Sequence, residues 1–587
     1  MENKRFDKIE ILIILVLVLL FSVRVYNLDN DLPAWGIVNY QPMDEGQYST
    51  MALNKYNSGS IRLDLKLENI DFLTSAHIRN NVIGNFFVYI GMLLFGDNYY
   101  GFRISSVLFG TLNYILFLLI LRNIKKIYGK EECSKWNNSI YVAMGVLLLV
   151  DFVYTVASRV IETSIYRMFF IQLIIFLFTI PKQSDIFEQK IRFLIAGILS
   201  VGSVFAVYIT NIFIPIAMFA TIIFCAIYKG KEYFFNAMFS FIAGAGIAYV
   251  LCDLYYNIVW GTSCIVNTMQ IISDFSGTNG YTGGTDILAL FGLLLHFLSA
   301  NSNLYNASIL YMFLLLLPIV GKLIIRKKDI NMFLVYNTIF FLLLQTFINE
   351  DYIVRKYIMV YPLLLYLIYY ILVQNTDERV KGYFENKKTT KIVYSIFCCM
   401  ICSVIVLYRL YFIENETYKD FSSTDKNIIM VQLIFILIAE IIFIISICKL
   451  QFHNKIYRIC FFNIILFSSI ITNVYFSGKH VYFYNSYTER ELMKNIANDV
   501  GDEWVYGVYA ISFTLYNDIK PIVNNYTIMG KEIENFDGKW YLDYSDYCFP
   551  QEVMGNKKNE WIEKQTYKRN FSTFGTKRSV SLYEIEH

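Results

Sequence analysis

Runs of about 20 apolar residues recur along most of this 587-residue chain, and they limit its fold more than any other feature. A helix of that length crosses the hydrocarbon core of a bilayer. Charged residues make up 17% of the chain, below the roughly 25% of a soluble globular protein. The sequence therefore predicts an α-helical polytopic membrane protein. About thirteen runs qualify as spans, at residues 9–28, 102–122, 138–157, 163–181, 191–209, 211–228, 233–256, 305–325, 330–348, 354–374, 389–412, 427–448 and 456–476.

The distribution of Lys and Arg between these spans predicts their orientation, because cytoplasmic loops carry an excess of both residues. With a cytoplasmic N-terminus, the loops on the inside hold basic residues from Arg122 to Arg458, whereas the outer loop 257–304 holds neither Lys nor Arg. We therefore expect a multi-pass protein of the cell membrane with a cytoplasmic N-terminus and an extracytoplasmic C-terminal region. Two further apolar stretches, 82–94 and 286–299, do not fit the alternation, and we expect them to lie in the interface or against the bundle.

Near Ser477 the apolar runs stop and charged residues return. We predict two domains: residues 1–476 form the transmembrane module, and residues 477–587 form a small extracytoplasmic α/β domain. The predicted elements of the second domain are a helix at 489–497 and strands at 504–509 and 579–583.

The first outer loop, residues 27–100, carries an adjacent pair of carboxylates, Asp44 and Glu45, soon after the first span. A carboxylate at the bilayer surface can accept a proton from a hydroxyl group or orient a ligand. The alternative is a solvated acidic loop. Tyr48, His77 and Arg79 lie in the same loop and are candidates for substrate binding.

Several cations lie at the outer ends of predicted spans, where Lys and Arg are depleted. They either reach lipid headgroups and local acidic partners or form an anion site that holds a phosphate. These candidate residues are Arg103, Arg159 with Glu162 three residues later, and the adjacent Arg355, Lys356 and Tyr357.

Taken in order, these motifs resemble the GT-C superfamily of polytopic glycosyltransferases. The resemblance covers roughly residues 1–375 and is nearest to the protein O-mannosyltransferases and the lipid A aminoarabinose transferases. In one segment the chain departs from the family pattern: it has Asn80-Asn81-Val82-Ile83 where the family often has His-Pro-Pro-Leu. Its nearest histidine, His77, lies three residues before this segment. The segments that carry the resemblance are Asp44-Glu45, Leu94-Phe95-Gly96, Phe102-Arg103-Ile104-Ser105-Ser106-Val107-Leu108-Phe109-Gly110, the turn with Arg159 and Glu162, and Arg355-Lys356-Tyr357-Ile358-Met359-Val360-Tyr361-Pro362.

The resemblance implies an enzyme of the cell envelope, mannosyltransferase-like, that uses a sugar linked to polyprenyl phosphate. It would transfer one sugar, with inversion, to an unidentified acceptor on the outer face: an envelope lipid, a wall polymer or a protein. Asp44 would act as the general base, with Glu45 as its catalytic partner, and the cations would bind the donor phosphate. The implied partners are the lipid-linked donor, the acceptor and the bilayer.

Two other classes of function stay open from the sequence: a transporter or flippase for a lipid-linked substrate, and a non-catalytic protein that binds the envelope. A net charge of +3 is too small to indicate nucleic acid as a partner. No cofactor is predicted. A divalent metal stays open, although an Asp-Glu pair without a nearby His does not define a metal site.

Overall fold

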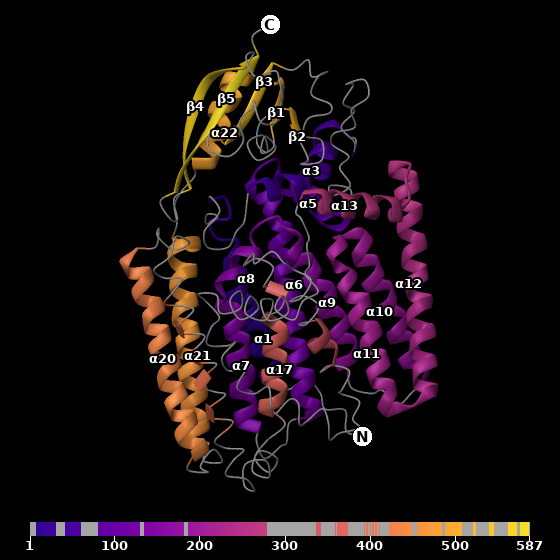
Figure 1. Ribbon diagram of the computed structural model, residues 1–587, viewed down its shortest axis with the longest axis vertical. Helices are drawn as coiled ribbons and strands as arrows, with labels where there is room; N and C mark the ends of the chain where they lie inside the picture. Colours follow the sequence, from indigo (N-terminus) through magenta and orange to yellow (C-terminus); the bar gives the residue numbers. More distant parts are fainter. Residues whose placement is uncertain are drawn as a thin grey trace.

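The computed structural model shows a helical bundle with a small β-sheet at one end, which we call the sheet end (Figure 1). The mostly helical fold confirms the predicted class. The structure describes residues 8–30, 42–59, 61, 80–128, 134–180, 186–278, 336–341, 358–359, 361–373, scattered positions from 393 to 410, 422–448, 455–483, 488–507, 520–523, 539–544, 561–571 and 576–585.

Four described helical segments are long and apolar enough to cross a membrane: Tyr99–Tyr128, Ile186–Ala206, Ile209–Lys229 and Lys231–Trp260. Shorter apolar helices accompany them, and most coincide with predicted spans. The spans predicted at 305–325, 330–348 and 389–412 lie wholly or mostly outside the described residues. The helices of the bundle are α1 (Lys8–Phe21), η1 (Ser22–Val25), α6 (Tyr99–Tyr128), α7 (Ser134–Val150), α8 (Phe152–Ala157), α9 (Thr163–Thr179), α10 (Ile186–Ala206), η4 (Ile209–Ile212), α11 (Phe213–Lys229), α12 (Lys231–Trp260), α17 (Tyr361–Val373), α20 (Ser423–Cys448) and α21 (Lys455–Ser477).

The predicted span 138–157 is two helices, since α7 ends at Val150 and α8 begins at Phe152. The Asp151 carboxylate between them accepts a hydrogen bond from the Tyr154 amide at 2.6 Å and caps α8. In the same way, Glu162 caps α9 by accepting from the Ser164 amide at 2.7 Å. These two caps define the tight turn that carries Arg159.

The helices α10 and α12 pack through glycine. A Cβ atom added at Gly244 would overlap the carbonyl oxygen of Leu194, and one added at Gly197 would overlap that of Phe241. Small residues let helix backbones approach closely in membranes, where apolar burial alone drives little association. By contrast α17, near the centre of the bundle, is buried on nearly every side, as expected for a helix that is apolar all round (Figure 1).

Three helices lie at the sheet end beside the bundle: α3 (Pro42–Ser58), α5 (Val82–Phe95) and α13 (Cys264–Thr278) (Figure 1). The apolar stretch predicted at 82–94 forms α5, which packs closely on α6, because a Cβ at Gly91 would overlap the Gly101 carbonyl oxygen. The stretch at 286–299 lies outside the described residues. Neither α3 nor α13 was predicted.

The C-terminal sheet has the strand order β2-β1-β3-β5-β4. Strand β1 pairs in parallel with β2 and β3, while β5 pairs antiparallel with β3 and β4. The predicted helix and both predicted strands are present, and the domain boundary itself stays a prediction. The elements are α22 (Thr488–Val500), β1 (Trp504–Gly507), β2 (Lys520–Val523), β3 (Trp540–Tyr544), β4 (Trp561–Phe571) and β5 (Thr576–Ile585).

Candidate active site

The Asp-Glu pair lies in the first turn of α3. Pro42 occupies the first position of this helix, where its fixed φ suits a helix and its missing N–H costs nothing. Glu45 is 2% exposed, so this residue does not belong to a solvated loop. Asp44 is within the helix, but its side chain is outside the described part of the structure.

Glu45 forms a buried, bidentate ion pair with Arg103 of α6. The Arg103 Nε donates to Oε1 at 2.9 Å, and Nη2 donates to Oε2 at 2.8 Å. The Ile161 amide also donates to Oε1, at 3.1 Å. Bidentate pairs of this kind fix geometry as well as adding energy. The carboxylate therefore ties α3 to both α6 and the turn before α9.

The remaining Arg103 donors hold the chain that follows the first helix. Nη1 donates to the carbonyl oxygens of Leu28 at 2.8 Å and Asn30 at 2.7 Å. The guanidinium carbon lies 4.3 Å from the ring centroid of Tyr99, close enough for a cation–π contact. Arg103 itself is 1% exposed.

Arg159 holds the neighbouring part of the same stretch of chain. Its Nη1 donates to the carbonyl oxygens of Arg24 at 2.6 Å and Tyr26 at 2.7 Å, and Nη2 donates to that of Asn27. Burial lowers the pKa of Arg159 to about 10, so the side chain stays cationic at neutral pH.

Asn30 joins these contacts into one unit. Its Oδ1 accepts from Arg159 Nη2 at 3.4 Å, and its Nδ2 donates to the Val481 carbonyl oxygen at 2.7 Å. Val481 belongs to η7 (Gly478–Tyr482), a π-helical turn that continues α21. We call Asn30, Glu45, Arg103 and Arg159 the Arg103 frame.

A second group of polar side chains includes Tyr48, three residues after Glu45 along α3. Arg167 of α9 donates from Nε to Asn211 Oδ1 at 2.8 Å, and its guanidinium carbon lies 5.7 Å from the Tyr208 ring centroid. The Tyr48 ring meets Tyr208 edge-to-face, with ring centroids 6.2 Å apart. We call Tyr48, Arg167, Tyr208 and Asn211 the Arg167 cluster.

Tyr48 connects this cluster to the carboxylate pair, since it follows Asp44 by one helical turn. Burial raises the pKa of Tyr48 well above its usual value, and Tyr208 and Glu162 raise it further. The hydroxyl is therefore a hydrogen-bond donor at neutral pH. Tyr48 and Met493 of α22 belong to the same apolar cluster, so the C-terminal region shares the apolar packing around this site.

The structure thus brings together Glu45, Arg103 and Arg159 in the frame, and sets Tyr48 and Glu162 near Arg167. The binding of a donor phosphate by Arg103 and Arg159 stays a prediction. What is observed is that their donors bond protein oxygens. The candidates outside the described residues are His77, Arg79, Arg355, Lys356 and Tyr357, and their roles also stay predictions.

Sequence reasoning missed Asn30 and Arg167. Asn30 gave no signal, since a single loop asparagine is unremarkable. Arg167 did give one, because an ionisable residue inside an apolar helix is rare and is often functional.

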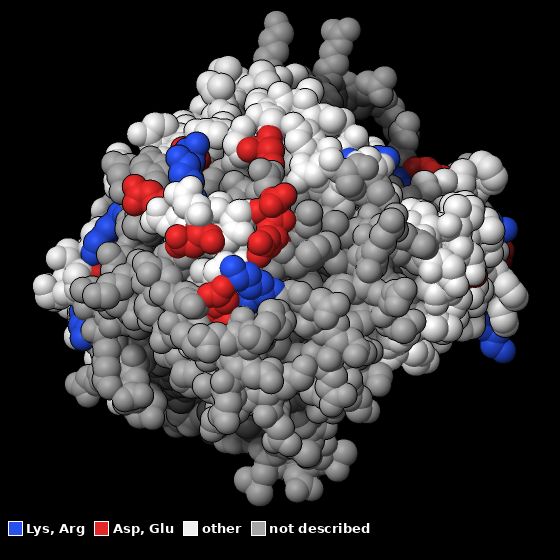
Figure 2. Space-filling model, turned by 90° about the horizontal axis from the view of Figure 1, so that it is seen from above, with Lys and Arg blue, Asp and Glu red and all other residues white. Residues whose placement is uncertain are grey.

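The ionic groups of the site lie beneath the surface. In the view onto the sheet end, acidic side chains gather near the middle of the described surface (Figure 2). Glu45, Arg103 and Arg159 do not contribute to that surface, because each is at most 3% exposed.

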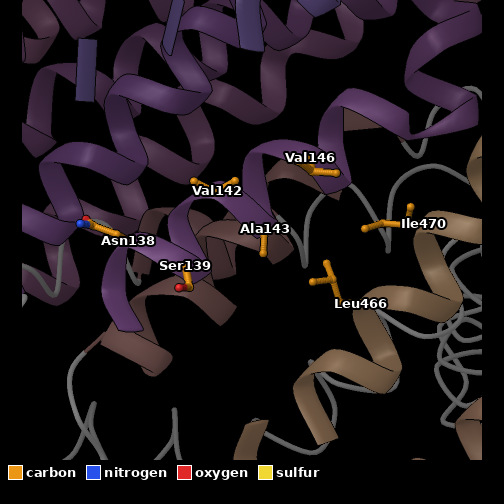
Figure 3. A pocket seen from close by; sticks show the side chains of 7 residues that line it. All are labelled: Asn138, Ser139, Val142, Ala143, Val146, Leu466 and Ile470. Atoms are coloured by element: carbon orange, nitrogen blue, oxygen red, sulfur yellow. The ribbon is translucent and has the colours of Figure 1, made fainter. Parts of the chain in front are cut away.

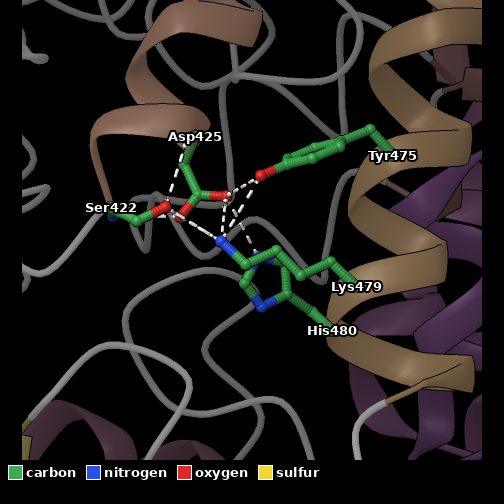
Figure 4. A network of polar contacts seen from close by, with 5 residues as sticks. All are labelled: Ser422, Asp425, Tyr475, Lys479 and His480. Carbon is green, nitrogen blue, oxygen red and sulfur yellow. Dashed lines mark hydrogen bonds and ion pairs between the residues drawn. The ribbon is translucent and has the colours of Figure 1, made fainter.

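Two other features of the bundle involve residues outside the frame and the cluster. A groove of about 520 Å³ between α7 and α21 has mostly apolar walls, with Asn138 and Ser139 at one end (Figure 3). A polar network joins the start of α20 to η7, where Lys479 Nζ lies 2.8 Å from Asp425 Oδ1 (Figure 4). Ser422 and Tyr475 donate to the same carboxylate, at 2.6 and 3.0 Å.

Comparisons with known proteins identify the fold. No model of a protein family and no curated protein sequence matches the chain. Among solved structures it is similar to ArnT from Cupriavidus metallidurans bound to undecaprenyl phosphate, with a TM-score of 0.55 and 10% identity over 97% of both chains. The apo state of the same protein gives a TM-score of 0.53 and 11% identity, again over 97% of both chains. At this identity the likeness shows the fold, and it confirms the predicted GT-C resemblance at that level.

Proposed function

We propose that this protein is a membrane glycosyltransferase that takes a single sugar from a polyprenyl-phosphate donor at the sheet end of the bundle. One observation carries the proposal: a buried, bidentate Glu45–Arg103 pair fixes the first turn of α3, beside Asp44. Catalytic groups must be held in a fixed geometry by neighbouring residues, and this pair would supply that support to Asp44. The undecaprenyl phosphate in ArnT supports a lipid-linked donor.

In the proposed reaction, an acceptor oxygen attacks the anomeric carbon as the bond from that carbon to the phosphate oxygen breaks. The bonding electron pair stays on the phosphate, which leaves as a monoester with added negative charge. Asp44 takes the proton of an acceptor hydroxyl, and direct displacement inverts the anomeric carbon. Groups that bind the leaving phosphate better than the diester lower the barrier.

We assign Glu45 to the positioning of α3, since both of its carboxylate oxygens accept from Arg103 and one also accepts from Ile161. The charge bias of the loops supports an orientation with the sheet end outside the cytoplasm. The acceptor is then a lipid, polymer or protein of the cell envelope.

The test is sugar transfer from a polyprenyl-phosphate donor in membranes that contain each variant. Asp44→Asn keeps the shape of the side chain but cannot take a proton at neutral pH. We expect transfer to a hydroxyl acceptor to fall by about 10²- to 10⁴-fold, the usual contribution of a general base.

The control is Glu188→Gln, the same change of acid to amide at a half-exposed residue that pairs with Arg192 away from the site. It should leave transfer unchanged. Full activity in Asp44→Asn would remove the base assignment and indicate a phosphate acceptor, which needs no base.

A further inference from the structure

The buried arginines of the bundle differ in how many of their donors have partners. The guanidinium groups of Arg24, Arg103, Arg159 and Arg192 each donate to at least three protein oxygens. Arg167 donates only from Nε, to Asn211, and in the described structure Nη1 and Nη2 have no hydrogen-bond partner. Yet Arg167 is 3% exposed, as deeply buried as Arg159.

A buried guanidinium with four free N–H groups is complementary to an anion with several oxygens. Its planar fork matches phosphate or carboxylate through two parallel hydrogen bonds. No ion pair is seen between the described side chains of Arg167 and Glu162, and Glu162 Oε2 is already bonded to the Ser164 amide. The nearby carboxylate therefore does not occupy the Arg167 donors.

The surroundings of Arg167 are built to hold it in place. Asn211 accepts from Nε, and its own Nδ2 donates to the Ser203 carbonyl oxygen at 3.1 Å, which fixes the orientation of the amide. Tyr208 lies against the guanidinium, and Tyr48 lies against Tyr208. Two phenol hydroxyls thus accompany the free N–H groups, one of them a turn away from Asp44 along α3.

We propose that Arg167, with Tyr48 and Tyr208, forms a binding site for a phosphate group beside Asp44. The inference rests on the proposed function in one respect, since it takes the phosphate of the polyprenyl donor as the ligand. Arg167 is the fifth residue of α9 and thus lies in the N-terminal part of that helix, which follows the turn that carries Arg159. Arg103 and Arg159 then hold the scaffold, and Arg167 holds the substrate.

The experiment measures binding of undecaprenyl phosphate and of inorganic phosphate to the purified full-length protein in detergent. We expect Arg167→Met to weaken binding of undecaprenyl phosphate at least tenfold and Arg167→Lys to weaken it less, because lysine keeps the charge and loses the fork. Competition by inorganic phosphate in the wild type supports recognition of the phosphate group alone. Binding of the lipid without such competition supports a lipid-linked phosphate.

Arg192→Met is the matched control. Arg192 of α10 is also a buried arginine, but its donors bond the carbonyl oxygens of Leu177 and Ile180, at the opposite end of α9 from Arg167. It should bind undecaprenyl phosphate as the wild type does. If Arg167→Met does not fold, the double variant Tyr48→Phe/Tyr208→Phe removes only two hydroxyl oxygens and should weaken binding severalfold.

Wild-type affinity in folded Arg167→Met, or in the folded double variant, overturns the proposal. This outcome is separate from the failure of the transfer mechanism. If Asp44→Asn stays active while Arg167→Met loses the lipid, the phosphate site stands and the base assignment falls.

Discussion

The Arg103 frame and the Arg167 cluster both contact α3 at the sheet end, and both centre on a buried arginine, but they differ in completeness. In the frame, Arg103 donates to Glu45 and to two carbonyl oxygens. In the cluster, Arg167 donates only to Asn211. The same residue type thus holds the fold in one place and leaves its donors available in the other. Depth and charge are alike, so the unused donors distinguish the two roles.

The largest expected effect comes from breaking the frame. Arg103→Met leaves the Glu45 carboxylate buried without its cation, and such a change costs about 3–5 kcal/mol. We expect a large drop in melting temperature and in the yield of folded protein in detergent. Arg167→Met is the same substitution in the cluster, and without a ligand it should lower the melting temperature much less than Arg103→Met, because it breaks one hydrogen bond to a neutral amide and no ion pair.

The double variant Glu45→Gln/Arg103→Met sharpens this test. It removes both charges and should recover part of the stability that Arg103→Met loses. Equal melting temperatures for Arg103→Met and the wild type would contradict the structural role of the frame.

A smaller effect is expected at Asn30, which links the frame to η7. Asn30→Ala leaves the Val481 carbonyl oxygen without its donor, at a cost of about 1–3 kcal/mol, but keeps the backbone contact to Arg103. We expect a melting temperature between those of Arg103→Met and the wild type. Asn30→Asp keeps an acceptor for Arg159 and loses the donor, so it should not rescue the Val481 link. If Asn30→Ala is as stable as the wild type, the bond from Asn30 to η7 does not stabilise the frame.

The smallest effect is expected in the network of Asp425. The Lys479 side chain is 38% exposed, so solvent screens its pairing with the carboxylate. Ser422 and Tyr475 also remain bonded to Asp425 without it. Lys479→Met should therefore change stability by less than about 1 kcal/mol and leave sugar transfer unchanged. If Lys479→Met lowered the stability as much as Arg103→Met does, solvent exposure would not explain the difference in strength between the two ion pairs.

The sequence predicted the elements of this fold better than their contacts. Spans such as 163–181 and 233–256 emerged as α9 and α12 because burial in lipid requires long apolar runs. Helix α3 was missed because its residues are mostly polar, and packing of Tyr48 and Ala52 at the sheet end stabilises it instead.

Prediction of the candidate site was uneven for a related reason. The sequence drew attention to Glu45, Arg103 and Arg159 by their type and their side of the membrane. It contained no information that the first two would pair across 58 positions. Nor could it reveal that Arg159 bonds backbone carbonyls, since a carbonyl is present at every residue. Arg167 was overlooked because an apolar helix was interpreted only as a span.

The hydrogen bond from Asn30 to Val481 also determines when the contacts of the frame can form during synthesis, because it joins residues 451 positions apart. Ribosomes add about 5–20 residues per second, so roughly 20 to 90 s pass between the synthesis of its two ends. During that interval Glu45 of α3 and Arg103 can already form their ion pair, whereas the side chain of Asn30 cannot yet bond to η7. The last contact of the frame therefore forms only when nearly the whole membrane module has been inserted, and a chain that stops before residue 481 cannot complete it.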